Sequence, residues 1–154
     1  MRPRRRRNPR LKLQLQAGPR VTGAPTRAQV RRWAGAALDK SGEITVRIVN
    51  TAEARRLNRR YRGENHATNV LSFPYALSRG TVQGDIVLCA PVIAREARTQ
   101  GKSLEAHYAH LTVHAVLHLL GHRHARRGEA ERMEALEKKV LAKLGYPDPY
   151  EASG

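Results

Sequence analysis

The order in which strand-like and helix-like segments follow one another is the feature that most constrains the fold. Leu11, Leu13 and Leu15 alternate with polar residues, a two-residue period that is typical of a half-buried strand. The same period recurs in the segment 43–50, and two shorter apolar runs follow further along the chain. The four expected strands cover residues 11–16, 43–50, 69–73 and 85–89.

Helix signals lie between and after these strands. Thr26 and Gln29 form a capping-box pattern, and Pro91 suits the first turn of a helix. Gly121 and Gly145 are expected to end the last two helices. The five expected helices cover residues 26–38, 51–61, 91–101, 103–120 and 130–144. This order predicts an α/β mixed (α+β) fold in which about five helices pack on a small mixed sheet.

Length and cysteine content fit a single domain in a reducing compartment. The chain has 154 residues, and we expect one domain over 11–150, preceded by an arm, 1–10, and followed by a tail, 151–154. Cys89 is the only cysteine, so no internal disulfide can form. The longest apolar stretch, Ile86 to Ala94, has nine residues, whereas a membrane-spanning helix needs about 20. These features predict a cytoplasmic protein that does not interact with membranes.

Positive charge is concentrated at the N-terminus. The formal net charge is +16, and residues 1–38 contribute +11 of it because the first acidic residue is Asp39. We expect the arm, with its six arginines, to be disordered in isolation. Such an arm attracts polyanions because binding releases their counterions. The charge therefore indicates an RNA partner, although a solvated tail without a partner would have the same composition.

Six of the seven histidines lie between positions 107 and 124. His114 and His118 are four residues apart, so on a helix they share one face and can reach one zinc ion at about 2.0–2.1 Å. Gly121 lets the chain turn, which can bring His124 back as a third ligand. Three protein ligands leave the fourth position to water, as a catalytic zinc requires. The spacing thus predicts a zinc site of His114, His118 and His124.

Several alternatives stay open for this cluster. A solvated, histidine-rich helix face has the same spacing, and His122 would join the stripe if the helix continued through Gly121. His107 and His110 are better explained as structural histidines or as partners of a ligand. The pair also resembles the zinc-peptidase signature His-Glu-x-x-His, but Ala115 stands where that signature has its general base.

The histidine segment resembles the hallmark of the YbeY family, bacterial rRNA maturation factors described as metal-dependent endoribonucleases. That hallmark reads His-Gly-x-Leu-His-Leu-x-Gly-Tyr-Asp-His, and the chain departs from it at Ala115, His122 and Arg123. The similarity extends from about residue 43 to 150. The other matching blocks are Tyr61-Arg62-Gly63, Thr68-Asn69-Val70-Leu71-Ser72-Phe73-Pro74, Gly84-Asp85-Ile86-Val87 and Gly145-Tyr146-Pro147-Asp148-Pro149-Tyr150.

The resemblance implies a four-stranded sheet, one zinc ion per chain in a cleft, and a zinc-dependent endoribonuclease specific for single strands. It implies late-stage maturation of the 16S rRNA 3′ end and 70S ribosome quality control. The small ribosomal subunit, ribosomal proteins and assembly GTPases are the implied partners, with no DNA specificity. It also implies a catalytic role for Arg62 beside His114, whereas the residues alone favour a surface arginine at a helix end. Arg123 replaces a carboxylate, so that carboxylate's role does not transfer.

Three further residues each have two interpretations. Asp85 stands at a strand start and either orients a ligand histidine or serves in a turn. Asn69 and Ser72 either line the cleft or pack within the strand. No general base is recognisable. The main alternative function is a non-catalytic ribosome assembly factor with a structural zinc, and a metallohydrolase of peptides is the third.

Overall fold

The computed structural model describes residues 10–75, 80–122 and 126–151. Its strands are β1 (Leu11–Ala17), β2 (Ser41–Val49), β3 (Val70–Pro74) and β4 (Thr81–Cys89). Its helices are α1 (Arg27–Ala37), α2 (Thr51–Arg62), α3 (Ala90–Thr99), α4 (Leu104–Leu119) and α5 (Arg127–Leu144). The predicted mixed fold is therefore confirmed. Residues 1–9 of the predicted arm and 152–154 of the predicted tail lie outside these ranges.

The four strands form one sheet in the order β1-β2-β4-β3. β1 is parallel to β2, β2 is parallel to β4, and β3 runs antiparallel to β4. The parallel pairs need long crossover connections, and the segments containing α1 and α2 supply them. β3 is thus an edge strand of the described sheet, with one side unpaired.

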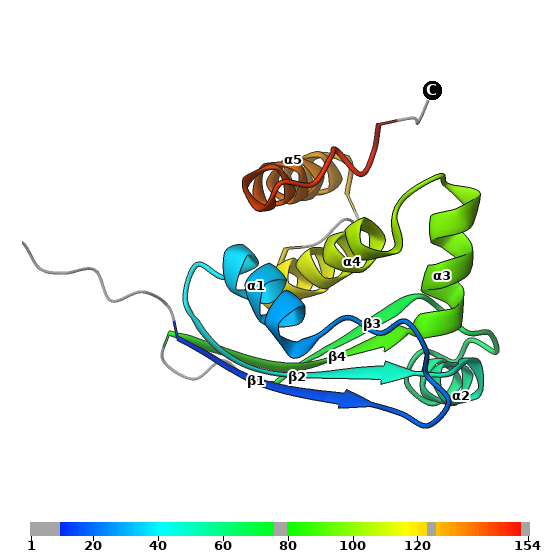
Figure 1. Cartoon of the computed structure of the whole chain (residues 1–154). Coiled ribbons are helices and arrows are strands. Elements are labelled where there is room, and N and C mark those ends of the chain that lie inside the picture. Colours follow the sequence, from blue (N-terminus) through cyan, green and yellow to red (C-terminus); the bar gives the residue numbers. More distant parts are fainter. Residues whose placement is uncertain (1–9, 76–79, 123–125, 152–154) are drawn as a thin grey trace, which may run out of the picture.

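Two layers of helices cover one face of the sheet (Figure 1). α1 and α4 lie next to the strands and α5 lies outside them, so α4 sits between the sheet and α5. The large apolar core fills this space and includes the fully buried Trp33, Ile86 and Val116. Ten of the sixteen residues of α4 are buried. The helix is therefore firmly packed, and the side chains on its less buried side have a rigid support.

The opposite face of the sheet has a smaller core under α2. Val87, Leu71 and Ala54 belong to this second cluster. Successive strand residues point to opposite faces, so Ile86 and Leu88 join the large core while Val87 joins the small one. No helix in the described ranges is both long and apolar enough to cross a membrane.

Local sequence signals fixed several helix ends. Thr26 and Gln29 form the predicted capping box, with each side chain bonded to the other residue's backbone N–H at 3.2 and 2.9 Å. Gly145 ends α5 in the left-handed conformation, with φ 90°. The predicted start of the fourth strand at Asp85 was four residues late, because Gly84 interrupts the apolar pattern yet pairs in register with Ile44.

Candidate active site

Helix α4 brings two of the predicted metal ligands together. His114 and His118 lie one turn apart, and their ring centroids are 4.8 Å apart with the planes at 69°. The helix is capped by Ser103, whose hydroxyl accepts from the N–H of Ala106 at 3.0 Å. Both histidine side chains line one groove. Two imidazoles at this spacing can bind one cation.

The third predicted ligand, His124, lies outside the described residues. The preceding turn has the predicted form: α4 ends at Leu119, and Gly121 adopts φ 97°. The backbone N–H of His122 returns to the carbonyl of Leu117 at 3.1 Å. Across the described ranges, no group of three histidine, cysteine, aspartate or glutamate side chains is placed to hold a metal ion. The three-histidine set stays a prediction.

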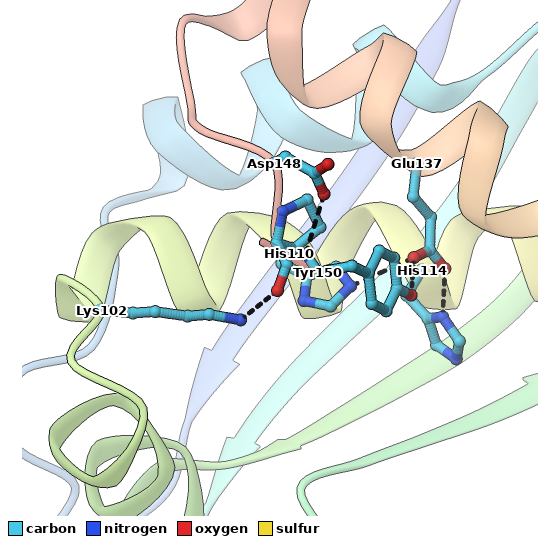
Figure 2. Close-up of polar contacts among 7 residues, drawn as sticks. Lys102, His110, His114, Glu137, Asp148 and Tyr150 are labelled. Carbon is cyan, nitrogen blue, oxygen red and sulfur yellow. Dashed lines mark hydrogen bonds and ion pairs between the residues drawn. The ribbon is translucent and has the colours of Figure 1, made fainter. Parts of the chain in front are cut away.

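A buried glutamate from α5 holds the first of the two histidines (Figure 2). The carboxylate of Glu137 is fully buried, and its Oε1 contacts Nδ1 of His114. Its Oε2 accepts from the hydroxyl of Tyr150 and contacts Nε2 of His110 at 3.1 Å. Sequence reasoning missed Glu137. The available signal was an acid within the apolar stripe that contains Met133 and Leu141.

These contacts keep the Glu137 carboxyl ionised. Burial by itself would raise its pKa, but hydrogen bonds from His110, His114 and Tyr150 outweigh burial and lower the pKa to about 2. Burial and the hydrogen bond to Glu137 both raise the pKa of Tyr150, so its hydroxyl keeps its proton at neutral pH. The group is therefore a carboxylate surrounded by donors.

The groove in front of the histidines runs along the edge strand β3 and has a volume of about 470 Å³. Residues from three elements and one loop line it. They are Tyr61, Arg62, Thr68, Asn69, Val70, Leu71, Ser72, Phe73, His114 and His118. The structure thus brings five of the predicted residues to one groove: Arg62, Asn69, Ser72, His114 and His118. No carboxylate is among the described residues that line it.

A second acid, the half-buried Glu96 of α3, supports the groove. The Nδ2 group of Asn69 donates to Oε1 of Glu96 at 3.0 Å, and the same oxygen contacts Nε2 of His107 at 3.0 Å. Burial lowers the pKa of His107, although Glu96 partly opposes this shift. His107 is therefore a structural histidine, which is one of its two predicted roles. Its partner, Glu96, also helps to position Asn69.

The end of α2 forms the other rim of the groove. Arg62 is the last residue of α2, and Gly63 caps the helix in the left-handed conformation with φ 71°. The neighbouring Tyr61 is 57% exposed and packs edge-on against Phe73 at a centroid distance of 5.0 Å. The guanidinium of Arg60 lies 5.5 Å from the centre of the Tyr61 ring. Cationic and aromatic groups thus meet at this rim.

Asp85 lies away from the histidines. It pairs with Phe73 in the β3–β4 ladder, on the face opposite to Gly84, which packs against Leu119 of α4. Its Oδ2 accepts from the hydroxyl of Tyr75, and this bond, with some burial, raises the pKa of Tyr75. The structure therefore does not bring Asp85 to His114 or His118.

The imidazole nitrogens in the groove are suitable ligands for a zinc ion. Nδ1 of His114 contacts Glu137, so Nε2 is the ring nitrogen suited to bind a metal, and a carboxylate behind a ligand histidine is typical of zinc sites. The chain is therefore an α/β protein with a candidate metal site. Two histidines of a central helix lie in a polar groove along one edge of its mixed sheet.

Comparison with known proteins gives the family. The family model described as "Endoribonuclease YbeY" matches residues 23–145. A protein of that name from Aromatoleum aromaticum is 61% identical over 127 residues, covering 82% of each chain. Another from Methylibium petroleiphilum is 55% identical over 147 residues, covering 92% of this chain and 95% of the relative. The chain belongs to the YbeY family.

A solved structure confirms the fold alone. The solution structure of TM1509 from Thermotoga maritima is similar with a TM-score of 0.52, although only 18% of residues are identical. The match covers 90% of this chain and 99% of that one.

Proposed function

We propose that this protein is a zinc-dependent endoribonuclease that cleaves single-stranded RNA. In the proposed role it acts in the cytoplasm, in late maturation of the 16S rRNA 3′ end and in quality control of 70S ribosomes. Its partners would be the small ribosomal subunit, with ribosomal proteins and assembly GTPases. The name shared by its relatives supports the endoribonuclease activity.

One observation carries the proposal: a single groove joins His114 and His118 on one wall to Arg62 on the other. His114, His118 and the predicted ligand His124 would hold the zinc ion. Three neutral imidazoles would leave that ion its charge of +2, and it would supply Lewis-acid chemistry for hydrolysis of a phosphodiester. The chain itself supplies a positive rim and hydrogen-bonding groups beside that position.

Arg62 is suited to hold the phosphate that is cleaved. A guanidinium presents donors in a fixed fork that matches two phosphate oxygens. Because no carboxylate is among the described groove residues, the side chains around the phosphate are neutral or positive and do not repel it. Asn69 and Ser72 line the same groove and offer hydrogen bonds to the RNA backbone or to base edges.

The helix before Arg62 supports binding of an extended strand. α2 carries five arginines within twelve residues, and its one acid, Glu53, is paired with Arg47. The arginines are Arg55, Arg56, Arg59, Arg60 and Arg62. Such a row neutralises successive phosphates, while the exposed ring of Tyr61 provides a stacking surface for an unpaired base. A base inside a duplex is not free to stack there, which favours single strands.

The test is cleavage of a single-stranded rRNA fragment by the purified full-length protein. We expect cleavage to be lost on chelation, restored by zinc, and reduced at least about 100-fold in His114→Ala and Arg62→Ala. His66→Ala is the matched control, because this histidine has a 63% exposed side chain and does not line the groove.

Unchanged cleavage in His114→Ala would refute the proposal. Zinc-dependent stability together with RNA binding but no cleavage in the wild type would instead favour the alternative, a non-catalytic assembly factor with a structural zinc. Cleavage of peptides in place of RNA would support the third possibility.

A further inference from the structure

Glu137 is an acid in the middle of an apolar helix face. It lies four residues after Met133 and four before Leu141, and none of the three is more than 2% exposed. Burial of a charge has a large desolvation penalty, and an apolar residue would pack there without it. Because the carboxylate lies among donors from α4 and from the segment after α5, its charge and its acceptor oxygens require an explanation other than packing.

The carboxylate decides which nitrogen of His114 carries a proton. An ionised carboxyl group has lone pairs but no hydrogen, so a ring nitrogen in contact with it must donate. Nδ1 of His114 contacts Oε1 of Glu137 and therefore bears the hydrogen. A neutral imidazole then carries its lone pair on Nε2. This is the nitrogen that can bind a cation.

The second carboxylate oxygen is held by two more donors. Oε2 accepts from Nε2 of His110 and from the hydroxyl of Tyr150. The Nδ1 atom of His110 is buried and has no hydrogen-bond partner in the described part of the chain. A neutral His110 with its hydrogen on Nε2 fits both observations, because only the lone pair is then left unmatched. Three donors thus fix the carboxylate in place.

Tyr150 reaches this carboxylate because the segment after α5 is tied to α1, to α5 and to the loop between α3 and α4. The hydroxyl of Tyr146 accepts from Nε1 of Trp33 at 3.0 Å. Nζ of Lys102 donates to the carbonyl of Pro149 at 2.6 Å, as seen at the left of Figure 2. Asp148 also pairs with Lys138 of α5 at 3.6 Å. The segment therefore delivers the tyrosine to Glu137 in a defined position.

We propose that Glu137 is a positioning residue, fixed by His110 and Tyr150, that holds His114 with the hydrogen on Nδ1 and Nε2 directed to the metal. The segment 145–151 thereby contributes to metal binding without touching the metal. This inference rests on the proposed zinc site. A carboxylate behind a ligand histidine also raises the basicity of the ring, so it strengthens the bond to the metal as well as orienting it.

Zinc affinity and the protonation of His114 test the proposal in the full-length protein. Competition with a chromophoric chelator should show about tenfold to 100-fold weaker zinc binding in Glu137→Gln. The nitrogen chemical shifts of the metal-free wild type should show His114 protonated on Nδ1. In Glu137→Leu this preference should be lost, because leucine cannot accept the hydrogen bond.

The tyrosine gives a milder test, because Tyr150→Phe removes only one hydroxyl donor to Glu137 and leaves the carboxylate in place. Tyr150→Phe should weaken zinc binding by about threefold to tenfold, since it loosens the carboxylate and leaves the ring contact intact. Tyr75→Phe is the matched control, because it also removes one tyrosine hydroxyl that donates to a carboxylate, but that carboxylate belongs to Asp85 and lies away from His114. Glu131→Gln controls for the charge, as its side chain is 70% exposed on the same helix.

Two results would overturn the inference. One is zinc affinity within twofold of wild type in both Glu137→Gln and Tyr150→Phe. The other is a metal-free wild type in which His114 is protonated on Nε2. A wild type that binds zinc and meets both expectations but cleaves no RNA would refute the nuclease and leave the positioning role intact. If the glutamate variants do not fold, Tyr150→Phe and the wild-type protonation state decide the matter.

Discussion

Substitution of Gly84 by alanine should separate the sheet from the helix that carries the histidines. Gly84 lies in β4 directly under the end of α4. A Cβ atom added there would stand 2.5 Å from Cδ2 of Leu119 and 2.8 Å from the backbone oxygen of Phe73. Both separations are shorter than a carbon atom tolerates. Leu119 follows His118 in the chain, so a displacement of its side chain acts next to a predicted metal ligand.

The two contacting atoms differ in how far they can move to relieve the clash. The Leu119 methyl group is the end of a flexible side chain, but the Phe73 oxygen belongs to the backbone of the paired strand. Overpacking of this kind costs about 1–3 kcal/mol, and alanine returns about 0.5–1 kcal/mol by restricting the unfolded chain. We expect a net loss near 1–2 kcal/mol, or roughly 2–8 °C in melting temperature for a domain of this size.

Thermal unfolding of the metal-free protein measures this effect. Gly35→Ala is the matched control, since Gly35 lies in α1 with nothing within 4 Å of the added Cβ. The same chemical change there should raise the free energy of unfolding by about 0.5–1 kcal/mol. Alanine should therefore lower the free energy of unfolding at position 84 and raise it at position 35. A Gly84→Ala variant as stable as wild type would show that α4 and β4 separate easily and that the packing argument is wrong.

Three further predictions concern pH, stacking and charge. Burial lowers the pKa of His107 below 6.5, so as the pH falls the unfolded chain takes up this proton before the folded protein does. At pH values below 6.5 the free energy of unfolding should therefore decrease by up to about 1.4 kcal/mol per pH unit. Urea unfolding of metal-free His107→Gln should show a smaller decrease, and an equal decrease would contradict this prediction. Tyr61→Ala should weaken single-stranded RNA binding by about 1–3 kcal/mol, measured by fluorescence anisotropy, whereas equal affinity would rule out stacking. Deletion of residues 1–10 should leave folding intact and flatten the salt dependence of RNA binding by up to about 0.7 in slope per arginine in contact with a phosphate; an unchanged slope would show that the arm makes no such contact.

Local chemistry made much of the fold readable from the sequence. The capping box at Thr26 and Gln29 and the glycine at 145 are signals that act within one turn of the chain, and the structure confirms both. The spacing of His114 and His118 likewise needs only the helical period to place both rings on one side. The start of β4 was missed because its pairing with β2, a long-range contact, overrides the local interruption at Gly84.

Longer-range relations needed the tertiary structure. The sequence by itself determined which segments are helices and strands, because hydrophobic period and capping are local properties of the backbone. It did not determine that β3 would be the edge strand along which Arg62, Asn69 and Ser72 meet the histidines. Nor did it show that Glu137, 23 residues beyond His114, would replace Asp85 as the acid behind that ring. Those relations depend on how layers stack, and stacking is decided by the burial of whole faces and not by any short stretch of chain.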